Sequence, residues 1–166
     1  MGDFIQAIEG SAIAVWVRES PSIFAYTTVL SLHAMGLAIV VGVGAAVSLR
    51  ILGVAPGIPI APLLKLFPVM WIGFTINAIS GVLLLAARAS DMLSNVMFII
   101  KIVLIALAVI SMELLRGRLA IDTATGQLIP SPRTRAFALS TLVLWIAAII
   151  AGRLTSYPNF VASFFS

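Results

Sequence analysis

The stretch that decides the fold is residues 21–49, which read PSIFAYTTVLSLHAMGLAIVVGVGAAVSL. An α-helix needs about 20 apolar residues to cross the hydrocarbon core of a bilayer, and this run is longer than that. Its one basic side chain is His33. Because an ionisable group costs free energy in lipid, His33 is expected to face protein, a cofactor or water, and it is a candidate functional residue.

The composition extends this interpretation to the whole chain. Of its 166 residues, 61% are hydrophobic and only 10% are charged, whereas a soluble domain carries about 25% charged residues. The mean hydropathy is +1.18. There is no cysteine, which excludes disulfides and thiolate metal sites. The net charge of +4 does not indicate nucleic-acid binding, because the basic residues lie at the ends of apolar runs, as in membrane proteins.

Apolar periodicity predicts a single transmembrane domain over residues 1–166, with four spans at about 21–52, 66–87, 96–115 and 132–157. Two of the spans begin with serine followed by proline, Ser20-Pro21 and Ser131-Pro132, which suits a helix N-cap and first turn. Residues 1–20 place apolar side chains at helical spacing, which predicts an amphipathic helix in the membrane interface. The expected fold is therefore all-α, a transmembrane four-helix bundle with an N-terminal amphipathic interfacial helix.

The connections are less regular. Residues 53–62 are rich in proline and glycine and predict a loop. Residues 117–130 fit either a small β-hairpin around a Thr-Gly turn or an irregular loop. The aromatic tail, residues 157–166, suits an interfacial anchor.

Basic residues predict the orientation. The first and third loops and their flanks, which share one side, hold Arg50, Lys65, Arg116, Arg118, Arg133 and Arg135. The opposite side holds Arg18, Arg88, Lys101 and Arg153, and the third loop is more basic than the second. The positive-inside rule then puts the basic loops in the cytoplasm and both termini in the periplasm of a bacterial inner membrane.

Small residues suggest where helices approach closely. In the first span they repeat every four residues, at Ala34, Ala38, Gly42 and Ala46. Such a stripe favours contact with another helix, from this chain or from a partner. Shorter strips occur in the second span (Gly73, Asn77 and Gly81) and in the fourth (Ala148, Gly152 and Ser156).

His33 has two interpretations. In the first it is functional, as a haem or metal ligand or as a proton-handling group. In the second it is a buried side chain hydrogen-bonded to Asn77, Ser80 or a backbone carbonyl. Gly36 on the same strip leaves room for a flat cofactor or for a neighbouring helix. Because the chain has no second histidine, a haem would need a methionine, a ligand from a partner, or five-coordinate iron. The candidate methionines are Met35, Met70, Met97 and Met112.

Lys101 lies near the start of the third span and Arg153 near the end of the fourth, so both are expected at the outer end of the bundle, inside or beside apolar runs. They either form a basic pocket for a haem propionate, a quinone head group or an anionic lipid, or extend toward the interface and pair with Glu19 and Asp91. Glu113 is expected to pair with Arg116 or Arg118 at helical spacing.

Three short motifs carry a resemblance to known proteins. The run from Leu32 to Gly53, with Leu-His-x-x-Gly near its start, resembles the first helix of small four-helix bacterial inner-membrane proteins of unknown function. Arg135-Ala-Phe-Ala-Leu-Ser and Gly152-Arg-Leu-Thr-Ser-Tyr resemble that group's last helix. The Leu-His-x-x-Gly pattern is more loosely similar to copper-resistance protein D and to b-type diheme membrane cytochromes, which use several histidines.

No phosphate-binding loop, nucleophile triad or paired carboxylates occur in the sequence, so we expect no enzymatic activity. The favoured function is a non-catalytic membrane subunit or accessory module of an inner-membrane complex. An electron-transfer complex is one such complex. One alternative is a haem-b electron carrier with His33 as axial ligand. The other is a small transporter or channel that works as an oligomer.

Overall fold

The computed structural model describes residues 2–125 and 129–157, and these form helices joined by short connections. Four helical segments are long and apolar enough to cross a membrane: α3 (Ile23–Ile51), η1 with α4 (Ala61–Leu66 and Phe67–Ala87), α6 (Val96–Ala124) and α7 (Pro132–Leu154). Three shorter helices, α1 (Gly2–Glu9), α2 (Ala12–Glu19) and α5 (Ala89–Leu93), lie at one end. The predicted all-α transmembrane bundle is confirmed, and the chain is a multi-pass membrane protein.

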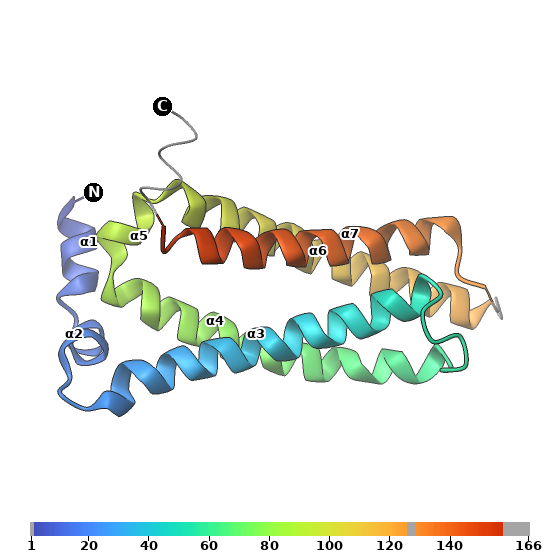
Figure 1. Cartoon of the computed structure of the whole chain (residues 1–166), viewed down its shortest axis with the longest axis horizontal. Coiled ribbons are helices and arrows are strands. Elements are labelled where there is room, and N and C mark those ends of the chain that lie inside the picture. The colour runs from blue at the N-terminus through green and yellow to red at the C-terminus, as the bar shows by residue number, and fades with distance from the viewer. Residues whose placement is uncertain (1, 126–128, 158–166) are drawn as a thin grey trace.

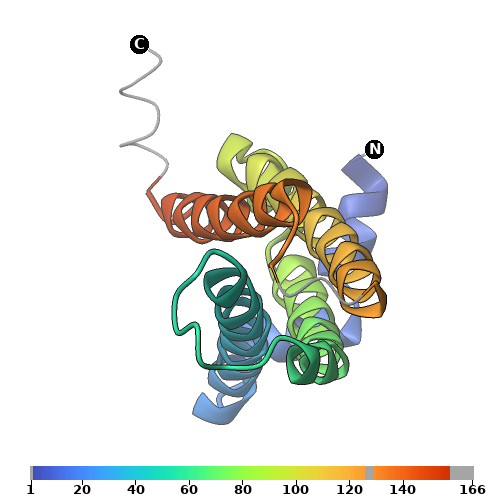
Figure 2. The same ribbon diagram turned by 90° about the vertical axis from the view of Figure 1, so that its right-hand side faces the viewer.

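The four long helices run up and down around a common axis in chain order (Figure 2). They form two pairs, α3 with α4 and α6 with α7, and α3 also packs against α7. We call the two ends of the bundle the α1 end, which carries α1, α2 and α5, and the η1 end, which carries η1 (Figure 1). The two pairs lie close together at the η1 end and separate toward the α1 end.

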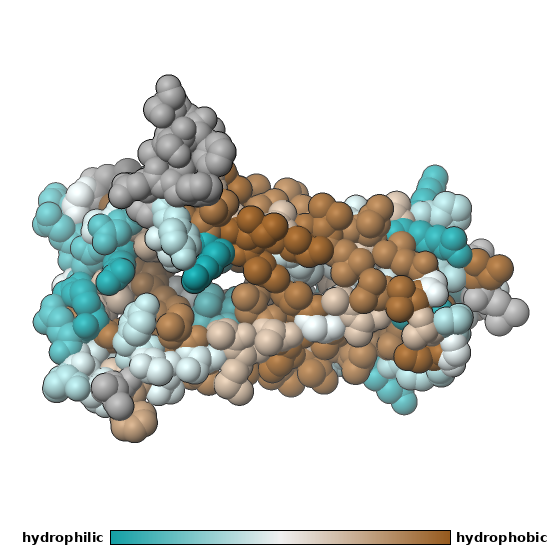
Figure 3. All heavy atoms as spheres, in the orientation of Figure 1, coloured by the Kyte–Doolittle hydropathy of each residue, from teal (hydrophilic) through white to brown (hydrophobic). Residues whose placement is uncertain are grey.

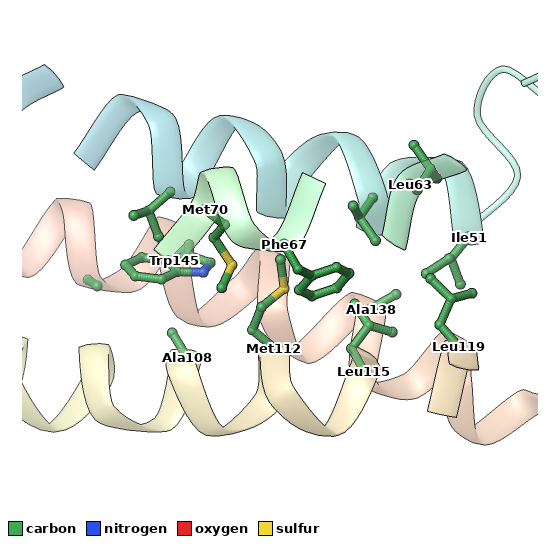
Figure 4. Close-up of a cluster of buried hydrophobic side chains, with 13 residues drawn as sticks. Ile51, Leu63, Phe67, Met70, Ala108, Met112, Leu115, Leu119, Ala138 and Trp145 are labelled. Carbon is green, nitrogen blue, oxygen red and sulfur yellow. The ribbon is translucent and has the colours of Figure 1, made fainter. Parts of the chain in front are cut away.

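The shared core lies in the η1-end half. Side chains from all four spans meet there, including Val47 of α3, Phe67 of α4, Met112 of α6 and Trp145 of α7 (Figure 4). Helices in lipid gain little hydrophobic driving force from association, so their stability rests on the close packing of such side chains.

Buried polar contacts join the α6–α7 pair. At its η1 end, the Asp122 carboxylate accepts hydrogen bonds from the Thr134 hydroxyl at 2.6 Å and from the Ser131 backbone N–H at 3.2 Å. Ser131 also caps α7, by accepting from the backbone N–H of Thr134. Nearer the middle, the hydroxyls of Ser111 and Thr141 lie 3.0 Å apart.

One helix start and one helix end differ from the pattern in the sequence. The N-cap of α3 is Ser22, whose hydroxyl accepts from the backbone N–H of Phe24, so the predicted cap at Ser20-Pro21 is wrong. The third span continues to Ala124, beyond the expected end near residue 115, because Leu119 and Asp122 pack against the rest of the bundle. Residues 117–124 are therefore helical, so both predictions for this connection, a β-hairpin and an irregular loop, are wrong there. Residues 126–128 lie outside the described residues. The predicted tail anchor falls mostly on residues 158–166, which also lie outside the described residues.

The interfacial segment is two helices, separated at Gly10 and Ser11. The Ser11 hydroxyl caps α2 by accepting from the backbone N–H of Ala14. Ala14 and Val17 are buried, while Trp16 is exposed on the outer side. Glu9, the last residue of α1, accepts hydrogen bonds from the backbone N–H and the hydroxyl of Ser90, and so ties α1 to α5.

Candidate functional site

The α1-end half contains a cleft between the two helix pairs. The space-filling view shows the surface hollowed between α3–α4 and α6–α7, with hydrophilic residues in and around the hollow (Figure 3). The apolar core that fills the η1-end half closes the cleft toward that end. His33 and Asn77 come from one helix pair and Lys101 from the other.

His33 and Asn77 hold α3 and α4 together by reciprocal hydrogen bonds. The imidazole Nδ1 lies 2.9 Å from the backbone oxygen of Asn77, and the Asn77 side-chain amide donates to the backbone oxygen of His33 at 2.7 Å. The Ser80 hydroxyl lies 3.3 Å from the same Nδ1 and donates to the backbone oxygen of Ile76. The predicted contacts of His33 with Asn77, Ser80 and a carbonyl are all present.

The shortest of these contacts indicates the tautomer of the imidazole. A backbone oxygen can only accept, so we assign the proton to Nδ1, which donates it to the Asn77 carbonyl at 2.9 Å, while the Asn77 amide nitrogen and the Ser80 hydroxyl lie farther away, at 3.3 Å. In the neutral ring Nε2 is then an acceptor. It has no hydrogen-bond partner among the described residues, and it is not one of the fully buried polar atoms that lack a partner. A histidine that binds a metal through Nε2 has the same arrangement, with its other N–H on a carbonyl.

Glycines make this contact possible. A Cβ on Gly36 would lie only 2.6 Å from the backbone nitrogen of Asn77 and 2.7 Å from the oxygen of Gly73, so α3 and α4 cross here with their backbones in contact. A Cβ on Gly81 would come within 3.0 Å of the imidazole. The sequence left room beside Gly36 for either a flat cofactor or a neighbouring helix. The neighbouring helix α4 fills it.

Lys101 lies on the opposite wall. The methylene chain of this side chain rests on the bare backbone of α7 at Gly152, where an added Cβ would lie 3.4 Å from its Cδ and Cε atoms. Its ammonium group is close enough to His33 for their charges to interact. Neither of the two ion pairs among the described residues, Arg18–Glu19 and Arg116–Glu113, includes Lys101.

Arg153 lies next to Gly152 in the last turn of α7 and is exposed. Its guanidinium donates to the Tyr157 hydroxyl at 3.1 Å and lies over the Tyr157 ring. The expected ion pairs of Lys101 and Arg153 with Glu19 and Asp91 do not form within the described residues, because Glu19 binds Arg18 instead. Glu113 pairs with Arg116, as predicted, and also accepts from the indole N–H of Trp71.

The stripe of small residues on α3 lies on the outside of the bundle. Ala34, Ala38, Gly42 and Ala46 are all exposed, and a Cβ on Gly42 would meet nothing within 4 Å. No other helix of the described residues packs on them, because α3 uses the neighbouring strip, Gly36, Val40, Gly44 and Val47, for its internal contacts. Within the described part of the chain the stripe is thus not a contact surface.

Sequence reasoning missed how the two walls are related. The strips containing Gly81 and Gly152 are visible in the sequence, but the side chains that rest on them from the paired helix, His33 and Lys101, are not. The separation of the helix pairs also has no local sequence signal. Another missed feature is Trp145, whose indole N–H is buried near Gly44 without a hydrogen-bond partner among the described residues.

The donor set restricts the chemistry of the cleft. The described residues contain no group of three or more His, Cys, Asp or Glu side chains that would hold a metal ion. Met70 and Met112 lie in the packed core, and Met35 is on the outer surface, so none of these three thioethers is available in the cleft as a second haem ligand.

No family model, curated protein or solved structure matches the chain.

Proposed function

We propose that the protein is a non-catalytic membrane subunit or accessory module that docks onto another chain in a bacterial inner membrane, through the outer face of α3. One observation carries the proposal. Ala34, Ala38, Gly42 and Ala46 form a continuous small-residue face that is exposed and unused inside the bundle. In lipid, faces of this kind allow two helix backbones to approach closely and gain van der Waals contact.

The test is the bulky variant Gly42→Leu. It adds a side chain to the docking face without touching any neighbour in the chain, so the bundle itself should keep its stability while the partner is lost. The matched control is Ala106→Leu, which enlarges an exposed position on α6. Affinity purification from the native membrane and the mass of the detergent complex measure the association. Full association of Gly42→Leu would refute docking through this face.

We further propose that the η1 end faces the cytoplasm and both chain termini the periplasm. The basic residues of the first and third loops support this orientation under the positive-inside rule. Because the chain has no cysteine, Thr125→Cys at the exposed end of α6 supplies a unique label site. It should resist an impermeant thiol reagent added to intact cells and react after the inner membrane is opened. Labelling in intact cells would reverse the orientation.

A haem-b electron carrier is the second candidate, supported by the free Nε2 of His33 and by Lys101 across the cleft, a cation suited to a propionate. Protein purified gently from its native membrane would then show a Soret band that His33→Ala removes. A colourless preparation would refute it. His33 would then act only in helix packing, and His33→Gln should be tolerated because an amide can replace its hydrogen bonds.

Transport by one chain receives less support, because apolar side chains from all four spans fill the η1-end half. A polar path would have to run between chains of an oligomer.

A further inference from the structure

The cleft contains a positive charge, that of Lys101, which no acidic side chain of the described residues neutralises. Lys101 lies five residues after Val96, the first residue of α6, which corresponds to about 7.5 Å along the helix axis. It is half-buried and belongs to neither ion pair of the described residues. A lysine inside the span without a protein counter-charge calls for an anion from elsewhere.

The lysine side chain extends along α7 near its end. Its methylenes lie against Gly152, which is two residues from the end of α7 at Leu154. The ammonium group thus lies near the end of a span, where lipid phosphates are expected. The exposed guanidinium of Arg153 adds positive charge at the same rim.

The opposite wall offers a group of a different kind. Nδ1 of His33 donates to the Asn77 carbonyl, so the neutral ring presents Nε2 as an acceptor. A ligand that satisfies both walls needs an anionic oxygen for Lys101 and a hydroxyl donor for His33. It also needs an apolar part, because the cleft opens between helices whose outer surfaces are apolar and face the bilayer.

We propose that the cleft binds one anionic phospholipid with a hydroxylated head group, of the phosphatidylglycerol type. The phosphate binds Lys101, with Arg153 at the rim, and a head-group hydroxyl donates to Nε2 of His33. The acyl chains leave the cleft sideways into the bilayer. This site is on the inner side of α3 and does not depend on docking through the neighbouring, outward-facing small-residue stripe.

The experiment uses the full chain in mild detergent, mixed with phosphatidylcholine vesicles that contain phosphatidylglycerol, with native mass spectrometry to count bound lipid. We expect one phosphatidylglycerol per chain, and about tenfold weaker binding by Lys101→Gln, since a charge-assisted hydrogen bond is lost. Lys101→Arg should retain binding. Lys65→Gln is the matched control, because Lys65 is an exposed lysine at the η1 end. Unchanged binding by Lys101→Gln would overturn the proposal.

Three further arms separate other ligands. Phosphatidylmethanol, which has the phosphate but no hydroxyl, should bind more weakly, and equal binding would overturn the role of His33. Inorganic phosphate alone should not raise the melting temperature, and a rise equal to that with the lipid would overturn the assignment to a lipid. A Soret band in the native preparation would show haem in the cleft and would overturn it as well. If Lys101→Gln does not fold, the salt dependence of wild-type binding decides, because binding of a neutral lipid would not weaken with salt.

Discussion

The two halves of the bundle are built from the same four helices but packed in different ways. At the η1 end, side chains of α3, α4, α6 and α7 share one core. At the α1 end, the helices stay paired while the pairs move apart, and hydrophilic residues lie in and around the space between them. The comparison shows that apolar composition alone does not bring membrane helices together, since both halves are apolar and only one is tightly packed.

The difference lies in the shapes and polar groups at each level. The η1-end half combines bulky Phe67, Met112 and Trp145 with small Gly44 and Ala108, so that large and small side chains interlock (Figure 4). The α1-end half instead has His33 on one helix pair and Lys101 on the other. Both side chains can carry a positive charge, and like charges repel. An anion between them is therefore more favourable than direct contact.

The largest expected effect tests the packed half. Phe67→Ala removes a side chain that is 1% exposed in the shared core, and we expect a loss of about 3–5 kcal/mol in the free energy of unfolding. Reversible unfolding in mixed micelles measures it. The control at the other end is Phe24→Ala, where the ring is 72% exposed. Equal losses for the two variants would show that the core is not confined to one half.

The next effect tests how α3 and α4 stay paired where the bundle opens. Gly36→Ala places a Cβ 2.6 Å from backbone atoms of α4, which cannot move as a side chain does. We expect a loss of about 1–3 kcal/mol from overpacking. Gly42→Ala, on the outer face of the same helix, should be neutral or stabilising by up to about 1 kcal/mol, because alanine favours the helix. Thermal unfolding of both variants compares them, and equal stability would disprove the close crossing at Gly36.

Some of this architecture follows from the sequence, and the reasons differ by feature. Span number follows from apolar length, and the serine cap of α7 follows from the pair Ser131-Pro132. The contact of His33 with Asn77 and Ser80 could be predicted because few polar groups lie at that depth in the second span. Local patterns decide all three, and so one sequence suffices to predict them.

The cleft could not be predicted, because it depends on relations between distant helices. The small-residue stripe and the Gly36 strip are neighbours on α3 and look alike in sequence. Only the packing of α4 against Gly36 shows which strip faces inward. The extension of α6 to Ala124 likewise depends on burial of Leu119 and on the bond from Asp122 to Thr134, which no local propensity encodes.

The smallest expected effect concerns how the open half is held together at its surface. The first helix, α1, attaches there through polar contacts, chiefly that of Glu9 with Ser90, whereas α2 packs through Val17 against Val29 and Ala87. These hydrogen bonds from the Ser90 backbone N–H and hydroxyl hold the pKa of the Glu9 carboxyl below its ordinary value of 4.5. Attachment of α1 should therefore depend on pH, whereas the apolar η1-end core should not.

Since the folded pKa of Glu9 is lowered, its contribution is complete above the unfolded value of 4.5 and is lost as the pH falls through the lower, folded pKa. A spin label on Gly2→Cys should become more mobile on acidification through that range, while a label on Thr123→Cys at the η1 end should not change. Glu9→Gln should abolish the transition, because an amide oxygen accepts from Ser90 but does not titrate. If α1 stays equally immobile in acid, other contacts hold it, and the α1 end is more tightly packed than its exposed polar bonds indicate.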